Sequence, residues 1–124
     1  MAVKVVDASA LAALLFAEPE ADAVAGQLGD SRLVAPGLLV FELANVCLLK
    51  ARRHPEQQDG LMAALRLRDR LGVEEIAVDH DAVVELAIAT GLTAYDASYL
   101  WLAHQLGAEL ITLDRQLARA AVTP

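Results

Sequence analysis

Apolar residues in this 124-residue chain form short runs whose spacing alternates between that of strands and that of helices. Val3–Val6 is rich in β-branched residues and is typical of a buried strand, and further strands are predicted at residues 33–35, 73–78 and 110–112. Longer segments with helical spacing separate the strands, and most end at a glycine or before a proline. They predict helices over residues 8–16, 21–28, 38–53, 56–71, 81–90, 93–106 and 114–121.

This alternation predicts an α/β domain, because a parallel sheet needs helical connections that cover both of its faces. The length fits one domain spanning residues 1–124. In such sheets the functional residues lie at the carboxyl ends of the strands. Asp7 and Asp114 each follow a predicted strand, so we expect both carboxylates at that edge.

The aspartates also have a structural explanation, which the sequence leaves open. Asp7 and Asp114 stand where an N-cap residue would begin the next helix. Asp96 ends the segment Thr93-Ala-Tyr-Asp96, which fits a capping box in which Asp96 reaches back to the helix start. Taken singly, each aspartate is as readily explained by a cap as by a functional role.

Glu42 has a weaker structural explanation. It lies in an apolar stretch, residues 38–46, with no lysine or arginine three or four positions away. A lone buried carboxylate is destabilising unless it protonates or finds a cationic partner, and a metal ion is such a partner. Asn45, one helical turn later, shares the face of Glu42 and is a candidate support for a ligand or bound water. The alternative is that Glu42 points to solvent at the edge of its helix.

Considered together, several carboxylates at one sheet edge would repel one another unless a cation balanced them. Ligands that are all oxygen favour Mg²⁺ or Mn²⁺ over zinc, and the three histidines show no ligand spacing. Mg²⁺ held by a few carboxylates is suited to phosphoryl chemistry. The pattern therefore predicts a Mg²⁺ or Mn²⁺ site built from Asp7, Glu42, Asp96 and Asp114.

Composition narrows the class of protein. Apolar residues make up 56% of the chain, but no stretch offers the ~20 apolar residues that span a bilayer, so a cytoplasmic protein without a membrane partner is expected. Cys47, the single cysteine, is expected to be buried and inert. The net charge of −7 argues against a protein that coats nucleic acid by bulk attraction. The segment from Lys50 to Arg70 holds six basic and three acidic residues, so it carries +3 and leaves −10 on the remainder.

Four short motifs resemble the PIN-domain family, and more closely the VapC-type ribonuclease toxins of VapBC toxin–antitoxin systems. The resemblance covers nearly the whole chain, and its carriers are Val5-Val6-Asp7-Ala-Ser9-Ala-Leu, Phe41-Glu42-Leu-Ala-Asn45, Leu92-Thr93-Ala-Tyr95-Asp96-Ala-Ser98-Tyr99 and Leu110-Ile-Thr112-Leu-Asp114. It implies a three-layer α/β/α fold with a short central parallel sheet of four to five strands. The family commonly has a further strand after the last helix, for which this chain has at most a stub at Val122-Thr-Pro124.

The resemblance also implies a Mg²⁺- or Mn²⁺-dependent endoribonuclease that hydrolyses structured RNA, such as tRNA or ribosomal RNA, to 5′-phosphate and 3′-hydroxyl ends. Its acidic quartet matches Asp7, Glu42, Asp96 and Asp114, of which Asp7 and Asp96 are the first candidates for direct metal ligands. Ser9 and Thr112 match polar residues that support those ligands. The family further implies a homodimer and a cognate VapB-type antitoxin whose tail fills the acidic groove.

The basic cluster is the predicted RNA-contacting surface. Its candidates are Lys50, Arg52 and Arg53, and the alternative is a solvated, partly self-paired helix face. Stacking on an RNA base is a candidate role for Tyr95. Tyr99 and Trp101 are predicted to pack in the core or in a dimer interface.

Two other functions compete with a nuclease. A catalytically silent PIN-like module that only binds an antitoxin or serves as a scaffold would be free to lose an acid, whereas this chain keeps all four. A phosphatase of the haloacid dehalogenase type also places an aspartate after its first strand. Its chemistry needs a second aspartate two residues later, where this chain has Ser9. A nuclease is therefore the favoured hypothesis.

Overall fold

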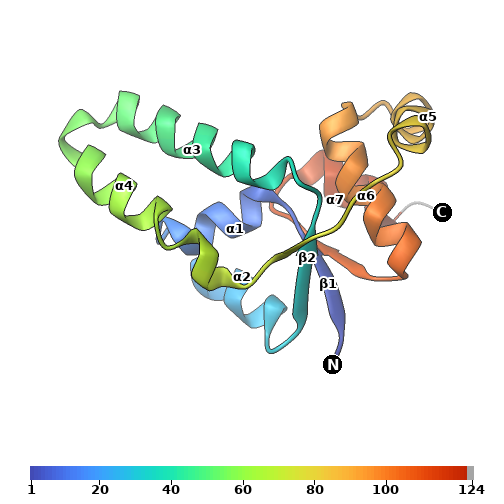
Figure 1. The fold of residues 1–124 in the computed structure, drawn as a ribbon, viewed down its shortest axis with the longest axis horizontal. Helices are drawn as coiled ribbons and strands as arrows, with labels where there is room; N and C mark the ends of the chain where they lie inside the picture. The colour runs from blue at the N-terminus through green and yellow to red at the C-terminus, as the bar shows by residue number, and fades with distance from the viewer. Residues whose placement is uncertain (123–124) are drawn as a thin grey trace.

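The computed structural model describes residues 1–122, which form three layers (Figure 1). Within these residues the central layer is a parallel sheet of four strands in the order β3-β2-β1-β4: β1 (Val3–Val6), β2 (Arg32–Ala35), β3 (Glu74–Glu75) and β4 (Glu109–Ile111). On one side of the sheet lie α1 (Ala8–Leu15), α2 (Ala21–Leu28), α3 (Leu39–Arg53) and α4 (Gln58–Leu65). On the other lie α5 (His80–Thr90), α6 (Ala94–Leu106) and α7 (Arg115–Val122). The predicted α/β/α fold is confirmed.

The strand order places the end of β1 at the switch point of the sheet. The chain runs from β1 outward to β2 and β3, and returns to pair β4 on the other side of β1. The backbone N–H of Asp7 donates to the carbonyl of Ile111 at 3.1 Å, so the ends of β1 and β4 are held directly together. Ligand sites in open parallel sheets form at such a point, where neighbouring connections leave in opposite directions.

The core explains why β1 is fixed so firmly. Val5 and Val6 are fully buried, and they belong to one apolar cluster with Leu11 of α1, Leu102 of α6 and Ile111 of β4. A strand buried on both faces reads as a continuous apolar run, which is what Val3–Val6 largely is. Packing from both helical layers therefore sets where β1 ends and the first acidic residue begins.

One predicted helix is wrong. Residues 56–71 do not form a single helix but a 3₁₀ turn (Pro55–Gln57), α4, and a second 3₁₀ turn (Arg68–Leu71). Leu65 and Leu71 both pack against the core. In one straight helix these residues, six positions apart, would point roughly 120° apart, so they could not both lie on the face that meets the core. The break after Leu65 lets both leucines reach it, and Gly72 ends the second turn with a positive φ of 69°.

The predicted strand over residues 73–78 is also shorter than expected. Only Glu74 and Glu75 pair with β2, opposite Val34 and Ala35. The last bond runs from the N–H of Ile76 to the carbonyl of Ala35 at 2.9 Å. Beyond that point β2 has turned away at Pro36, so residues 76–78 have no strand to pair with. The other predicted elements differ from the observed ones by about one residue at their ends.

The sequence also predicted a stub of a further strand at the carboxyl end of the chain and no membrane-spanning segment. The stub predicted at residues 122–124 falls largely on residues 123–124, which lie outside the described residues, and Val122 is the last residue of α7. Over the described part of the chain, none of the helices has both the length and the apolar character needed to cross a membrane.

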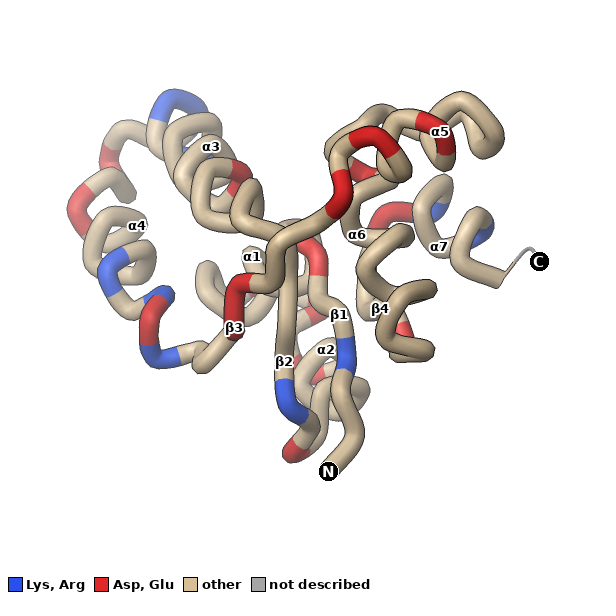
Figure 2. The backbone as a smooth tube through the Cα atoms, turned by 45° about the vertical axis from the view of Figure 1, so that its right-hand side comes forward, with Lys and Arg blue, Asp and Glu red and all other residues tan. Residues whose placement is uncertain are grey.

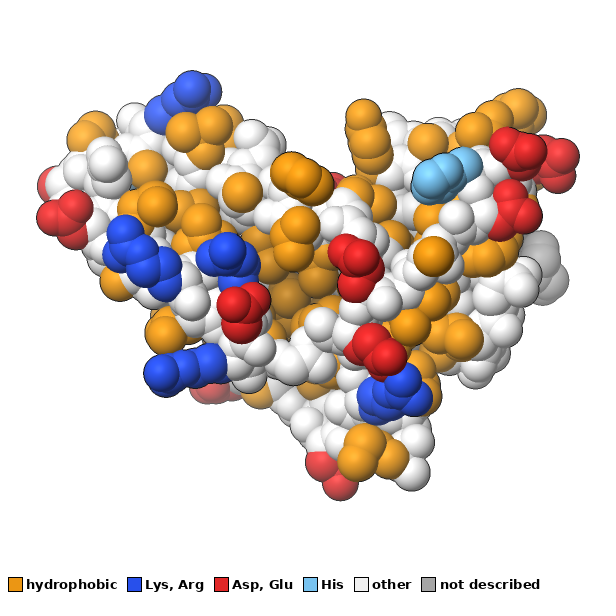
Figure 3. All heavy atoms as spheres, in the orientation of Figure 1, with side chains coloured by type: hydrophobic (Ala, Val, Ile, Leu, Met, Phe, Trp, Pro, Cys, Tyr) orange, Lys and Arg blue, Asp and Glu red, His pale blue; other side chains and the backbone are white. Residues whose placement is uncertain are grey.

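Two arms rise from the sheet and leave a notch between them. The α3–α4 arm comprises α3 and α4, and the α5–α6 arm comprises α5 and α6, and each pair of helices packs together. Figure 2 shows acidic positions at the end of β1 and at the starts of α6 and α7, whereas basic positions gather at the far end of α3 and after α4. Figure 3 shows hydrophobic side chains on both sides of the notch. The charges therefore differ between the base of the notch and the outer part of the α3–α4 arm.

Candidate active site

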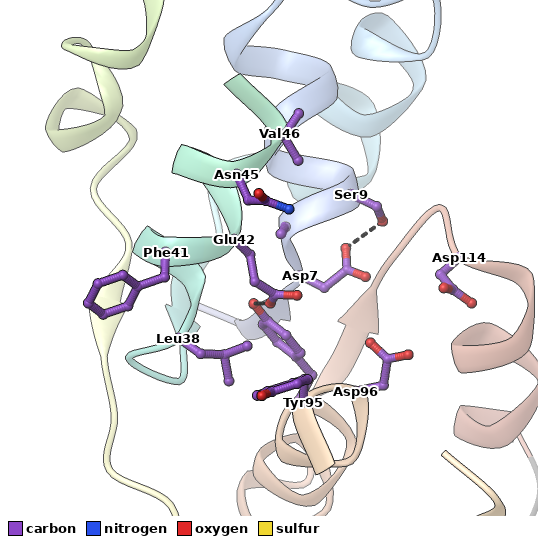
Figure 4. Close-up of a pocket in the computed structure, with 12 residues that line it drawn as sticks. Asp7, Ser9, Leu38, Phe41, Glu42, Asn45, Val46, Tyr95, Asp96 and Asp114 are labelled. Atoms are coloured by element: carbon purple, nitrogen blue, oxygen red, sulfur yellow. Dashed lines mark hydrogen bonds between the residues drawn. The ribbon is translucent and has the colours of Figure 1, made fainter. Parts of the chain in front are cut away.

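A cleft of about 550 Å³ lies at the base of the notch and is lined by all four predicted acids (Figure 4). Asp7 follows β1, and Asp114 lies in the connection between β4 and α7. Glu42 is in the first turn of α3, and Asp96 is in the first turn of α6. Residues that are up to 107 positions apart in the chain therefore share one cavity, as the strand order requires.

Asp7 is the most deeply placed of the four. Asp7 is 4% exposed, yet its carboxylate accepts three hydrogen bonds. Oδ1 accepts from the hydroxyl of Ser9 at 2.7 Å and from the backbone N–H of Ala10 at 3.0 Å, and Oδ2 accepts from the hydroxyl of Thr112. The bond from Ala10 makes Asp7 the N-cap of α1, so the capping explanation is correct and coexists with a place in the cleft.

Ser9 and Thr112 extend this arrangement to the fourth acid. Each hydroxyl donates to Asp7 and also accepts a backbone N–H, Ser9 from Leu113 at 2.9 Å and Thr112 from Asp114 at 3.0 Å. The carboxylate of Asp114 in turn caps α7 by accepting from the N–H of Leu117 at 2.9 Å. The two hydroxyls therefore fix the β4–α7 connection against β1, and with it the position of Asp114.

Glu42 does not point to open solvent. It is half-buried in the wall of the cleft, where its Oε1 accepts a hydrogen bond of 2.6 Å from the hydroxyl of Tyr99. Burial raises the pKa of Glu42, while the bond from Tyr99 lowers it and the nearby charges of Asp96 and Asp7 raise it. Burial also raises the pKa of Tyr99 far above its ordinary value, and the bond to Glu42 adds to this, so the tyrosine remains the donor.

Asp96 differs from the other three acids because its carboxylate has no donor in the described part of the chain. The helix start is capped by Thr93, whose hydroxyl accepts from the N–H of Asp96 at 3.1 Å. Among residues 1–122, no donor bonds the carboxylate of Asp96 itself. The predicted capping box, in which Asp96 reaches back, is therefore wrong, because this side chain turns into the cleft instead (Figure 4).

The cleft is electrostatically unbalanced. Burial is the largest cause that raises the pKa of Asp7 and of Asp96, and the charge of Asp114 raises both further. Among the described residues, none of those that line the cleft is a lysine, arginine or histidine. Several carboxylates without a basic partner, partly removed from water, need a cation or protons to balance them.

The donor set fits a hard divalent cation. All the charged side chains that line the cleft offer carboxylate oxygens, and the free oxygens of Asp96 have no competing donor among the described residues. Across residues 1–122, no three acidic, histidine or cysteine side chains stand close enough to ligate one ion together. Mg²⁺ is compatible with this spacing, because it commonly takes one or two carboxylates and keeps several waters. A shared cleft is thus present, whereas direct coordination by all four acids stays a prediction.

The other predicted site residues form few contacts with the four acids. Asn45 lines the cleft one turn after Glu42, but forms no hydrogen bond with it among the described residues. Lys50 pairs with Glu18 at 3.2 Å and lies over the ring of Phe16 at 5.9 Å, whereas Arg52 and Arg53 are exposed at the end of α3. All three histidines are exposed: His54, His80 and His104.

Sequence reasoning missed the role of one aromatic residue. Tyr99 was predicted to pack, and its ring is buried, but its hydroxyl also meets Glu42 in the cleft. The available signal was its spacing, three residues after Asp96, which puts both on one face of α6. Cys47 is buried as predicted, with its thiol 3.7 Å from the carbonyl of Leu61.

The family is decided by comparison with known proteins. Residues 4–122 match the PIN domain. The chain belongs to the PIN-domain family. This PIN domain is 36% identical to Ribonuclease VapC3 of Pyrobaculum aerophilum over 128 aligned residues, which cover 97% of this chain and 98% of that protein.

Two further relatives of this PIN domain come from the same organism. Exonuclease VapC9 of Pyrobaculum aerophilum is 34% identical over 82 residues, which cover 64% of this chain and 60% of that protein. The crystal structure of PAE2754 from Pyrobaculum aerophilum superposes with a TM-score of 0.79 at 27% identity, covering 98% of this chain and 81% of that one. The resemblance to VapC-type PIN domains that the four motifs predicted is confirmed.

Proposed function

We propose that this PIN domain is a Mg²⁺- or Mn²⁺-dependent endoribonuclease and the toxin of a type II toxin–antitoxin pair. The observation that carries the proposal is the cleft that Asp7, Glu42, Asp96 and Asp114 line together, with no basic side chain from residues 1–122 in its wall. The 36% identity to Ribonuclease VapC3 along the whole chain supports phosphodiester hydrolysis as the reaction. The favoured substrate is structured RNA such as tRNA or ribosomal RNA.

The residues of the cleft suit the reaction in distinct ways. A divalent cation held there would polarise the phosphodiester and favour deprotonation of the attacking water. Asp7, fixed by three hydrogen bonds, offers a rigid ligand, and Asp96, whose carboxylate has no donor within residues 1–122, offers an adaptable one. Glu42 and Asp114 lie on the walls, where a carboxylate can hold the ion directly or accept a hydrogen bond from a water. Water then attacks phosphorus and the P–O3′ bond breaks, which leaves a 5′-phosphate and a protonated 3′-hydroxyl.

The proposal includes two partners. A cognate VapB-type antitoxin would place its tail in the acidic cleft, where a cationic side chain on the tail would balance the carboxylates. The active form would be a homodimer, as the family resemblance implies. Light scattering of the purified chain tests the dimer, and co-purification with a co-expressed VapB-type antitoxin tests the partner.

The central experiment incubates the purified chain with total RNA and Mg²⁺ or Mn²⁺, beside Asp7→Asn and Asp96→Asn. Cleavage that needs the ion and disappears in both variants supports the nuclease. Cleavage of equal rate in wild type and variants would assign it to a contaminant. A wild-type chain that binds an antitoxin but cuts no RNA would favour the catalytically silent module instead.

A further inference from the structure

Tyr99 is a buried polar residue at the wall of the cleft whose hydroxyl has a single partner among the described residues. Tyr99 is 1% exposed, and its ring belongs to the apolar core together with Leu100 and Leu102 of α6. The hydroxyl leaves this core and donates to Oε1 of Glu42 at 2.6 Å. A bond this short to a carboxylate is charge-assisted and stronger than an ordinary one.

This bond joins two helices that otherwise belong to different parts of the fold. α3 packs on α1 and α4, whereas α6 packs on α5, β1, β4 and α7. Within residues 1–122, the bond from Tyr99 to Glu42 is the hydrogen bond that connects α3 with α6, and Glu42 accepts no other. A glutamate has three side-chain torsions, so without this donor Glu42 would sample several rotamers at the cleft wall.

We propose that Tyr99 is a positioning residue that holds Oε1 of Glu42 and thereby turns Oε2 into the cleft, towards Asp7, as the oxygen offered to a divalent cation or its water. In Figure 4 the second oxygen of Glu42 points to the side on which Asp7 lies. The inference rests on the proposed function for the presence of a cation. It makes a separate claim about which oxygen of Glu42 is available and what fixes it.

The position of Tyr99 in the chain gives this role a simple basis. Tyr99 follows Asp96 by three residues, so one face of α6 carries both a candidate ligand and the support of another ligand. Asp7 receives its support from Ser9 and Thr112, and Tyr99 does for Glu42 what those hydroxyls do for Asp7. Such outer hydrogen bonds commonly change metal affinity by about 10- to 100-fold when they are removed.

The test is the variant Tyr99→Phe, which removes the hydroxyl and keeps the buried ring. Mn²⁺ binding is measured by isothermal titration calorimetry on the metal-free full chain, so the readout does not require RNA cleavage. We expect Mn²⁺ affinity to fall by about 10- to 100-fold. In the Glu42→Gln background the same substitution should have no further effect, because the carboxylate that Tyr99 positions is absent.

Ser98→Ala is the matched control. Ser98 is also buried on α6, and its hydroxyl donates to the carbonyl of Tyr95 at 2.6 Å without reaching Glu42. Removing that hydroxyl should lower the melting temperature slightly and leave Mn²⁺ affinity as in the wild type. A loss of Mn²⁺ affinity in Ser98→Ala as large as in Tyr99→Phe would mean that any buried hydroxyl of α6 matters, which overturns a specific role for Tyr99.

Glu42→Asp serves as a second variant if Tyr99→Phe does not fold. The shorter carboxylate cannot both reach Tyr99 and keep its place in the cleft, so it should lose affinity by the same order. Wild-type affinity in Tyr99→Phe, or an equal loss in the Glu42→Gln background, would refute the inference. Mn²⁺ binding without RNA cleavage by the wild type would refute the proposed function alone, and no Mn²⁺ binding by the wild type would refute both.

Discussion

The two ends of the cleft hold their carboxylates in opposite ways. At the β1–β4 end, Asp7 is buried and accepts three hydrogen bonds, two of them from hydroxyls that also bind the β4–α7 connection. At the α6 end, Asp96 is half-buried and its carboxylate has no donor among the described residues. The first end is organised before any ligand arrives, and the second has oxygens left for one.

Because of this difference, Asp7 and Asp96 would contribute to the binding of a metal ion in different ways. A carboxylate that already satisfies several donors is fixed in place and binds an ion with little loss of side-chain entropy. A carboxylate without donors is destabilised in the free protein and gains most when a cation arrives.

The largest effect is expected from Asp7→Asn and Asp96→Asn. Each substitution removes a charge that would hold the ion, and loss of metal assistance should lower the rate of RNA cleavage by about a thousandfold.

The stability of the two variants should distinguish the two ends of the cleft. Asp96→Asn removes repulsion and none of the hydrogen bonds seen within residues 1–122, so its melting temperature without metal should equal or exceed that of the wild type. Asp7→Asn should melt below Asp96→Asn. Scanning calorimetry in EDTA measures this, and the reverse order would contradict the comparison.

Thr112→Val tests whether the organised end depends on its hydroxyls. The substitution keeps the branched shape but removes the donor to Asp7 and the acceptor for the N–H of Asp114. Cleavage should fall by about 10- to 100-fold in single-turnover kinetics at saturating Mn²⁺. Thr90→Val is a suitable control, because its hydroxyl bonds the carbonyl of Leu86 in α5, outside the cleft. Equal rates for Thr112→Val and the wild type would leave the network without a role in catalysis.

The pH dependence of stability tests the unbalanced charge. Burial raises the pKa of Asp7, Glu42 and Asp96 above ordinary values of 3.8, 4.5 and 3.8. Between the ordinary and the raised pKa values the folded chain therefore holds protons that the unfolded chain has lost, so the free energy of unfolding falls as pH rises through this window. Thermal melts in EDTA from about pH 4 upward should show the fall, and Asp96→Asn should reduce it.

Saturating Mg²⁺ gives the complementary measurement, because an ion that binds only the folded, ionised site should oppose the fall at higher pH. A wild type and an Asp96→Asn variant with the same pH dependence in EDTA would show that Asp96 does not contribute to it.

The smallest effect is expected away from the cleft, at the end of α3. Arg52 and Arg53 are exposed, about 15–17 Å along the helix axis from Glu42, and each should contribute one phosphate contact. Replacing both by alanine should weaken RNA binding by catalytically inactive Asp96→Asn protein and reduce the salt slope by about 2. Lys50→Ala should change stability more than the salt slope, because Lys50 is paired with Glu18. Arg32→Ala, at the amino end of β2, is a control that removes one arginine outside the α3–α4 arm, where Arg32 pairs with Glu74, and it should leave the salt slope unchanged.

Much of the fold was predictable because local rules and burial agree in this chain. The valine-rich run of β1, the caps at Asp7 and Thr93, and the glycines that end α5 and α6 all act where the sequence indicates. The predictions of secondary structure failed where contacts between residues far apart in the chain determine where an element ends. The helix predicted over residues 56–71 breaks so that Leu65 and Leu71 can both pack, and β3 stops where β2 turns away at Pro36.

The same division holds for the acids. The sequence by itself determined which residues carry the charge, because a carboxylate after a β-strand or within an apolar helix turn is visible from its neighbours alone. Only the tertiary structure decided how each is held. The bonds from Ser9 and Ala10 to Asp7 are local, but the bond from Thr112 to Asp7 and the bond from Tyr99 to Glu42 join residues from different elements. The strand order β3-β2-β1-β4 brings those elements to one edge.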